Sequence, residues 1–322
     1  RKSPYFGTGD QALGTARSIA AGTGFSLVVT RENNQVWSFG TNKAVGVSDT
    51  NAAYGGQIGI GVAPKATYVT ENLGGTATTV SPALVLQPDT LYYPVPQAVH
   101  SLEDIGTLTN ISSVAAGANF ALALRADGTV YSWGSNASGQ LGNPEAGSRS
   151  LVPVQVAAGA SDPNGYYIDQ VTRIAAGTNH GVALKKNGQV YAWGYNGDGQ
   201  LGNGSTQNQG APVQCTSSVV SGKAASQIAA GDNHTLMRLK DGTGDLVVAW
   251  GQNTSGQLGI NTSNNVSHPM RLRGYNGGGY MNNLVAISGG QNHAMALRSD
   301  GSVFAWGSNA SGQLGNATTV SE

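Results

Sequence analysis

One ten-residue pattern recurs four times along the chain and constrains the fold more than any other feature. It reads W-G-x-N-x-x-G-Q-L-G and runs from Trp133 to Gly142, from Trp193 to Gly202, from Trp250 to Gly259 and from Trp306 to Gly315. The fifth tryptophan, Trp37, opens an interrupted copy in which Gly55-Gly56-Gln57-Ile58-Gly59 arrives late. Such a repeat predicts a repeat architecture, in which each copy is one unit that packs on its neighbours.

Each unit is expected to form about four β-strands. In the unit at 168–215, two β-rich runs flank Lys186-Asn187-Gly188, and an Asn-Gly pair between such runs is typical of a two-residue hairpin turn. A proline-containing run such as Leu151 to Val156 closes the unit and suits an outermost strand, because proline has no amide donor. No long stretch has helical periodicity. The fold class that follows is an all-β propeller of four-stranded blades, with five clear repeats and an insertion in the first blade.

Three units carry the longer pattern A/S-A/G-G-x-N-H before the hairpin. Together with the Trp motif, it resembles the repeats of the regulator of chromosome condensation (RCC1) family over about 19–317. The resemblance implies a propeller that typically has seven blades, of which five are readable here. It leaves the function open, because the family includes exchange factors for small GTPases, secreted enzyme inhibitors and extracellular repeat proteins.

The chain is expected to divide into a short leading segment and a propeller. Residues 1–18 are interpreted as the end of a preceding or closing blade, because Tyr5 to Gly14 resembles a worn repeat tail. Residues 19–322 form the RCC1-like repeats, with an insertion at about 41–113. Long loops on a rigid scaffold often carry binding function, so Tyr68, Tyr92 and Tyr93 in this insertion are candidate contacts for a protein or a glycan. The alternative is a surface elaboration with no partner.

Charge and composition restrict the partners. The formal net charge is +0, from 17 basic and 17 acidic residues, which argues against nucleic acid because phosphate binding needs a basic excess. Charged residues make up only 11% of the chain, and such a weakly charged surface suits an extracellular or cell-surface protein, with the cytoplasm as the alternative. The sequence contains no apolar run long enough to span a membrane. The single Cys215 excludes an internal disulfide.

Three histidines occupy one repeat position. His180, His234 and His293 take a place that Phe120 and Phe25 take in the other units. Since the place accepts an apolar ring, the histidines are interpreted as structural residues that bond within their own blade. A ligand or metal cluster is the alternative, but side chains on separate blades do not suit compact zinc geometry. No metal and no cofactor are expected.

A basic residue precedes each hairpin turn: Arg31, Arg125, Lys186, Lys240 and Arg298. Blade symmetry places them on one face, where they form either an anion-binding ring or solvated charges that neighbouring acids cancel. Arg125, Lys186, Lys240 and Arg298 therefore join the tyrosines as candidate binding residues.

No catalytic motif is present: G-x-S-x-G, H-E-x-x-H and the P-loop are all missing. We expect a non-enzymatic protein-interaction or structural module, with self-assembly left open. The alternatives are an intracellular exchange-factor-like regulator and a secreted enzyme inhibitor.

Overall fold

The computed structural model describes residues 13–42, 57–60, 92–101, 106–159, 166–242, 244–274 and 278–322. These residues form nineteen β-strands and no helix. Every pair of neighbouring strands is antiparallel, and each sheet follows the order of the chain. The prediction of repeated, all-β blades is confirmed.

Five sheets correspond to the five repeats. Blade 1 contains β1 (Ala16–Ala21), β2 (Phe25–Thr30), β3 (Val36–Thr41) and β4 (Tyr92–Ala98). Blade 2 contains β5 (Ile111–Ala116), β6 (Phe120–Arg125), β7 (Val130–Ser135) and β8 (Arg149–Gln155). Blade 3 contains β9 (Val171–Ala176), β10 (His180–Lys185), β11 (Val190–Gly194) and β12 (Gln209–Gln214). Blade 4 contains β13 (Ala225–Ala230), β14 (His234–Leu239), β15 (Leu246–Gly251) and β16 (Val266–Arg271), and blade 5 contains β17 (Leu284–Gly289), β18 (His293–Arg298) and β19 (Val303–Gly307).

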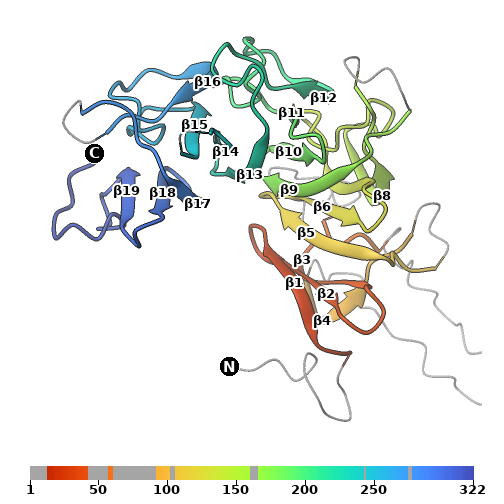
Figure 1. Ribbon diagram of the computed structural model, residues 1–322. Helices are drawn as coiled ribbons and strands as arrows, with labels where there is room; N and C mark the ends of the chain where they lie inside the picture. The colour runs from red at the N-terminus through yellow and green to blue at the C-terminus, as the bar shows by residue number, and fades with distance from the viewer. Residues whose placement is uncertain are drawn as a thin grey trace, which may run out of the picture.

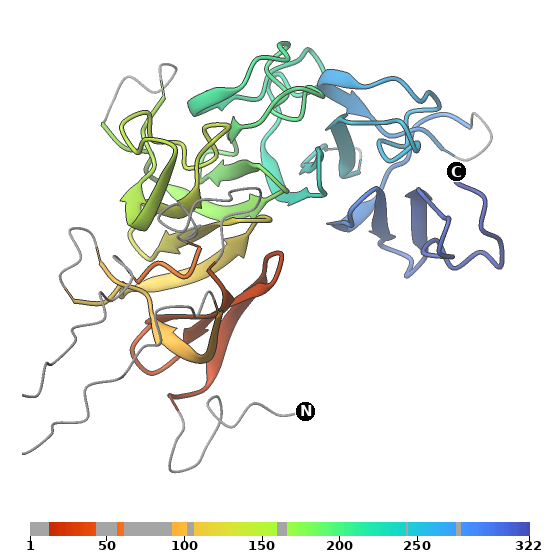
Figure 2. The same ribbon diagram turned by 180° about the vertical axis from the view of Figure 1, so that it is seen from behind.

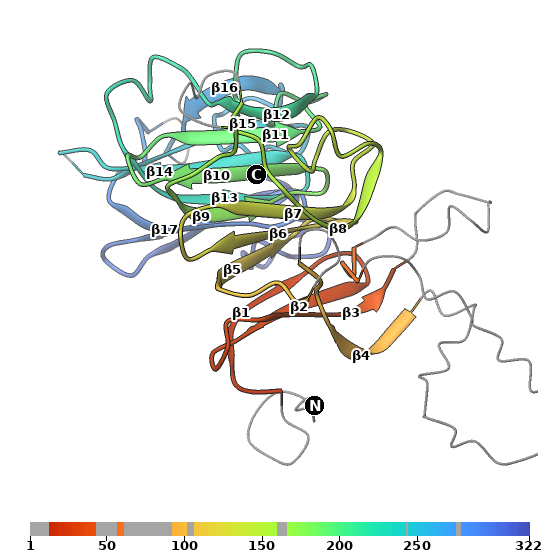
Figure 3. The same cartoon turned by 90° about the vertical axis from the view of Figure 1, so that its right-hand side faces the viewer.

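The blades follow an open arc from blade 1 in red to blade 5 in blue (Figure 1), and the reverse view shows the same two blades standing apart (Figure 2). Successive blades pack through their first two strands: β1 and β2 contact β5, β5 and β6 contact β9, β9 and β10 contact β13, and β13 and β14 contact β17. Side-on, the strands of blades 2 to 4 lie in stacked layers (Figure 3). Apolar clusters fill the space between neighbouring blades, which is where the chain buries its core.

Blade 5 has three strands among the described residues. Beside β19, Glu322 exchanges two backbone hydrogen bonds with Gly307. The corresponding glycine of blade 4, Gly251, pairs with Val266 at the start of β16.

Four tryptophans link each blade to the one before it. The indole Nε1 of each donates to a glutamine carbonyl in the preceding blade: Trp133 to Gln57, Trp193 to Gln140, Trp250 to Gln200 and Trp306 to Gln257, at 2.8–2.9 Å. We call these the indole bonds. All four side chains are buried, as the repeat predicted. The motif is therefore an inter-blade connection as well as a loop within its own blade.

The last glycine of the motif is required by this contact. Gly142 has φ 63°, which L-residues with a side chain rarely adopt, and a Cβ there would lie 2.8 Å from the indole of Trp193. The leucine before it is fully buried in blades 2, 3 and 4 (Leu141, Leu201 and Leu258) but only half-buried in blade 5 (Leu314).

The asparagine of the motif organises its own loop. Its Oδ1 accepts the amide of the motif leucine in each of the four regular units, at 2.9–3.0 Å. In blade 4 the Nδ2 of Asn253 donates to the carbonyl of Thr262, and the Asn253 side chain is fully buried. Two N-x-S/T sites, Asn253 and Asn309, are therefore structural residues that the folded chain keeps from solvent.

The first repeat has a different register from the one that its tryptophan indicates. Gly40 pairs with Phe25 as Gly194 pairs with His180, so Phe39 occupies the place of Trp193. Trp37 instead aligns with Tyr191, because Val28 pairs with Trp37 as Ala183 pairs with Tyr191. Equating Trp37 with the other four tryptophans was wrong. Phenylalanine has no N–H, so Phe39 cannot donate the indole bond that the other four blades make.

Only parts of the predicted insertion at 41–113 are described. Residues 57–60 supply the Gln57 carbonyl that Trp133 uses, and β4 closes blade 1 beside β3. Both belong to the regular blade. Residues 43–56 and 61–91, including Tyr68, lie outside the described residues, so a binding role of the insertion stays a prediction.

Candidate interaction surface

The blades place two kinds of connection on opposite faces of the arc. The hairpin turns between second and third strands lie next to the start of the following blade, because Gly128 accepts the amide of Val171 and Gly188 accepts that of Ala225. We call the surface formed by these turns and the blade-to-blade connectors the turn face. The Trp-motif loops and the turns between first and second strands lie at the other strand ends and form the loop face. Side-on, the connections emerge at both edges of the strand layers (Figure 3).

Polar groups of the loop face largely bond to one another. The motif glutamines accept backbone amides of their own loops, as in the bond from Asp198 to Gln200 at 3.0 Å. Near the axis, one backbone bond joins each blade to the next, as in Ala118 to Thr178 and Thr178 to Asp232. A hollow of about 320 Å³ at this end is lined mainly by the glycine-rich turns between first and second strands. Thr23, Thr178, Asp232 and Gln291 are the polar residues of its lining.

The histidine position connects blades. The hydroxyl of Thr235 donates to the carbonyl of Gln200 at 2.9 Å, so its oxygen accepts the Nε2–H of His180 at 3.0 Å. The neutral Nε2–H tautomer of His180 follows. The Gln200 carbonyl also accepts the indole bond of Trp250. The prediction of a bond within the same blade is wrong for His180, because Thr235 belongs to blade 4.

Both nitrogens of the buried His234 lack a hydrogen-bond partner, since the next blade has Ala294 where Thr235 stands. Burial lowers the pKa of His180 from 6.5 to about 3, and the neighbouring His234 contributes. Burial likewise lowers the pKa of His234 to about 4, with a contribution from His293. These histidines are neutral at physiological pH. Among the described residues, no group of three His, Cys, Asp or Glu side chains is placed to hold a metal ion.

The five basic residues near the hairpin turns fall into two positions. Arg125 and Arg298 end their strands and are half-buried: Arg125 lies 3.5 Å from Asp127 and Arg298 lies 3.9 Å from Asp300. Backbone and side-chain hydrogen bonds from Ser302, together with the charge of Arg298, hold the pKa of Asp300 below its usual value. These arginines are largely neutralised by their own turns. Arg31 is exposed and donates from Nε to the carbonyl of Ala16.

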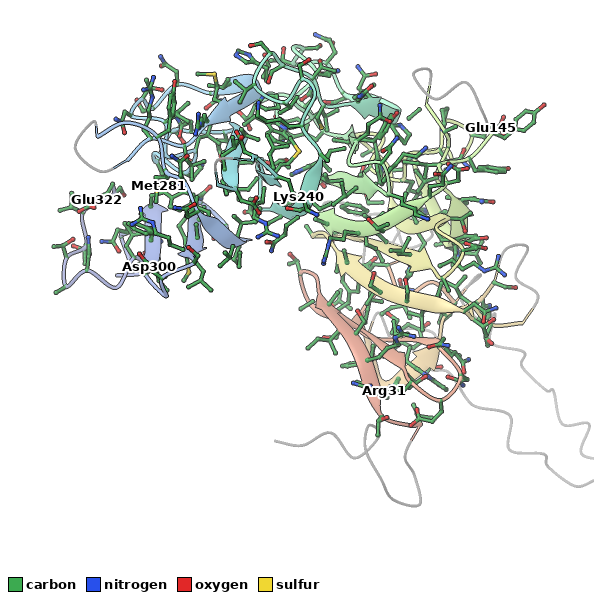
Figure 4. The ribbon with its side chains drawn as sticks, in the orientation of Figure 1. Arg31, Glu145, Lys240, Met281, Asp300 and Glu322 are labelled. Carbon is green, nitrogen blue, oxygen red and sulfur yellow. The ribbon has the colours of Figure 1, made fainter. Side chains whose placement is uncertain are left out.

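Lys186 and Lys240 stand one position later and are exposed. Neither forms an ion pair with a described residue. Figure 4 shows Lys240 on the inner side of the arc, and Arg31 and Asp300 near its two ends. Of the four basic candidate residues, Arg125, Lys186, Lys240 and Arg298, the two lysines therefore offer charge to a partner.

The predicted tyrosines are placed differently. Tyr93 is only 5% exposed and belongs to the core between blades 1 and 2, so its side chain is a packing residue. Tyr92 begins β4, and its side chain, like all of Tyr68, lies outside what the structure describes. The proline run that contains Tyr93 was the signal for a strand rather than a loop.

Three other tyrosines are exposed on the turn face and were missed. Tyr166 is 92% exposed and Tyr167 47% in the connector before blade 3, and Tyr280 is 45% exposed in the connector before blade 5. The guanidinium groups of Arg271 and Arg273 lie 4.4 and 4.3 Å from the ring centre of Tyr280. Tyrosine and arginine dominate binding energy in many protein interfaces. In the sequence, all three tyrosines come just before a buried apolar residue of a connector. Tyr166 and Tyr167 precede Ile168, and Tyr280 precedes Met281.

Residues 4–322 match the family model for the RCC1-like domain. The chain belongs to the RCC1-like family. Its relatives include the ultraviolet-B receptor UVR8 of Arabidopsis thaliana, 30% identical over 70% of this chain and 47% of the receptor. The probable E3 ubiquitin-protein ligase HERC6 of Homo sapiens is 32% identical over 70% of this chain and 20% of the ligase. The chain thus spans about half or less of these relatives.

Solved structures share the fold. Prp20p of Saccharomyces cerevisiae matches with a TM-score of 0.67 and 18% identity over 95% of this chain and 61% of that one. The match to human WBSCR16 has a TM-score of 0.66 and 23% identity over 92% and 63% of the two chains. The Prp20p structure was described together with its binding to Gsp1p and histones. The RCC1-like propeller is a protein-interaction module, and the chain matches only this part of the HERC ligases. No helix among the described residues is long and apolar enough to cross a membrane.

Proposed function

We propose that this chain is a non-enzymatic module that binds a protein partner through its turn face. The observation that carries the proposal is the difference between the two faces. The loop face uses its polar side chains in its own hydrogen bonds, whereas the turn face exposes Lys186, Lys240 and the tyrosines of two connectors. Tyrosine supplies a large contact area at low entropic cost, and exposed lysines favour a partner with acidic residues near its contact.

The turn face is proposed in preference to the insertion. Of the three candidate tyrosines in the insertion, Tyr93 is buried, and no structural observation supports Tyr68 and Tyr92 as contacts. Arg125 and Arg298 are proposed as residues at the border of the interface, because their carboxylate neighbours already neutralise them. Ion pairs of this exposed kind contribute little to binding.

The cytoplasm is the proposed location. The extracellular expectation rested on low charge, and the relatives do not support it: they include ubiquitin ligases. A single buried cysteine is compatible with a reducing compartment.

A peptide-display selection tests the proposal. Peptides selected on the wild-type chain are measured against a turn-face variant, Lys186→Glu, Lys240→Glu, Tyr167→Ser and Tyr280→Ser. A matched loop-face variant, Ala137→Glu and Thr254→Glu, changes exposed residues at the tips of two Trp-motif loops. Binding should fall at least about tenfold in the turn-face variant only, the equivalent of about 1.4 kcal/mol. Loss confined to the loop-face variant, or to deletion of residues 62–90, contradicts the proposal.

A further inference from the structure

Three of the four blade junctions receive one buried apolar side chain from the connector. Leu108, Ile168 and Met281 each stand three residues before the first strand of their blade, and all three are buried. The amide of each donates to the carbonyl that ends the preceding blade: Leu108 to Val99 at 2.8 Å, Ile168 to Val156 at 3.0 Å and Met281 to Leu272 at 3.3 Å. Figure 4 shows Met281 beside blades 4 and 5. We call this the plug position.

The junction between blades 3 and 4 has no plug side chain. The third residue before β13 is Gly222, and an atom placed as its Cβ would have no neighbour within 4 Å. Cys215 occupies the place of Val156, since its amide donates to Val190 as that of Val156 donates to Val130. The Cys215 carbonyl, unlike that of Val156, accepts no hydrogen bond from the described residues.

A cavity of about 490 Å³ lies between blades 3 and 4 and opens on the turn face. Val190, Cys215, Met237 and Leu239 are its buried apolar lining. The second strand of blade 4 is more apolar beside the cavity than the second strand of blade 3, because Met237 and Leu239 stand where blade 3 has Ala183 and Lys185.

The mouth of the cavity is polar. Asn187, Gln189 and Lys223 line it together with Ser217, whose buried Oγ has no hydrogen-bond partner among the described residues. Val220 of the connector packs at one side without closing the space. An apolar interior with a few polar groups at the opening is typical of a pocket that takes a side chain.

We propose that this junction pocket binds a leucine, isoleucine or methionine side chain presented by a partner peptide. The peptide amide donates to the Cys215 carbonyl, and the side chain lies among Val190, Met237 and Leu239, as Ile168 fills the junction between blades 2 and 3. The free Ser217 hydroxyl donates to a peptide carbonyl. The choice of side chain follows from the three equivalent junctions of the same molecule, which receive Leu108, Ile168 and Met281. The proposal deepens the proposed function, because the pocket opens on the turn face.

A peptide copied from the chain's own plug is the probe: acetyl-Tyr-Tyr-Ile-Asp-amide, from Tyr166 to Asp169. Titration into the full chain is followed by methyl NMR of Met237, which lines the pocket. The Met237 methyl signal should shift and saturate, and replacing Ile by Asp in the peptide should weaken binding at least about tenfold. An unmoved Met237 signal, or equal binding of the Asp peptide, overturns the proposal.

Two substitutions in one connector provide the matched comparison. Ser221 and Ser218 are both exposed, but only Ser221 lines the cavity. Ser221→Trp should block the peptide and Ser218→Trp should leave its affinity unchanged, with an unaltered methyl spectrum elsewhere showing that both variants fold. Equal affinity in the two variants overturns the junction pocket. If the display-selected peptides then still lose affinity for the turn-face variant, the proposed function stands without the junction pocket. If neither the turn-face variant nor Ser221→Trp weakens their binding, both proposals are wrong.

Discussion

A single side chain, His234, shows how the repeat tolerates an unsatisfied polar group. It occupies a position that Phe25 and Phe120 occupy elsewhere, and both of its ring nitrogens are buried without a partner. Such a group costs free energy, and the cost rises when the ring must be protonated. The position therefore supplies packing first, and only His180 adds a hydrogen bond between blades.

Acid should destabilise the fold through these histidines. The folded pKa of His234, about 4, lies below its ordinary value of 6.5, so the unfolded chain binds a proton more readily. The stability that the neutral His234 ring contributes is fully present above about pH 6.5 and is lost as the pH falls toward 4. When the pH is lowered from about 7.5 to about 5, the free energy of unfolding should fall in both proteins. The fall should be about 2 kcal/mol smaller in His234→Phe than in the wild type. Equal losses in urea titrations of the two proteins would show that His234 is not buried and neutral.

The motif glycine can be tested against a glycine with the same backbone. Gly142 and Gly147 have φ of 63° and 64°, but only Gly142 faces an indole, that of Trp193. Gly147→Ala should cost about 1 kcal/mol from backbone strain. Gly142→Ala should cost about 3 kcal/mol or more, because it also separates two blades. Thermal unfolding of both variants measures the difference, and similar losses would refute the contact.

Among the elements, the Trp-motif loop connects one blade to the next. The indole bond recurs at all four junctions of the described blades. The buried leucine beside it contributes apolar area in blades 2, 3 and 4. The loop is therefore both a turn and an interface, which explains why its sequence varies so little between units.

Leucine truncation should show where the loop is packed. Leu201→Ala removes a fully buried side chain and should destabilise the chain by about 2–4 kcal/mol. Leu314→Ala changes a half-buried residue in blade 5 and should cost less than half as much. Chemical denaturation of the two variants provides the test. A loss below about 0.5 kcal/mol for Leu201→Ala would mean that the motif does not pack between blades.

Sequence repetition predicted the blades, their hairpin turns and the buried tryptophans, because these features recur in register. It failed where the register changes. Trp37 drew attention away from Phe39, since no pattern shows which of two aromatic residues two positions apart takes the place of the motif tryptophan. Gly222 was missed because the plug position is defined as the third residue before the first strand of a blade. It can be located only when the start of that strand is known. Tyr93 was misassigned because a tyrosine in a long insertion can equally belong to a strand.

For the whole molecule, the arc divides its surface by chemistry. Loops that bond to themselves gather at one end of the strands, whereas exposed lysines, tyrosines and the junction pocket gather at the other. This division is the basis of our proposal that a protein partner binds the turn face. The insertion around Tyr68 stays an untested second surface.

Amide hydrogen exchange with a bound peptide tests this assignment most directly. The strongest peptide from the display selection is added to the full chain, and exchange is compared with that of the free chain. The account predicts slower exchange at residues 186–189 and 219–224, which form the turn and connector around the junction pocket. Residues 195–208 of the loop face should exchange unchanged. Protection confined to residues 195–208, or to residues 62–90 of the insertion, would contradict the account.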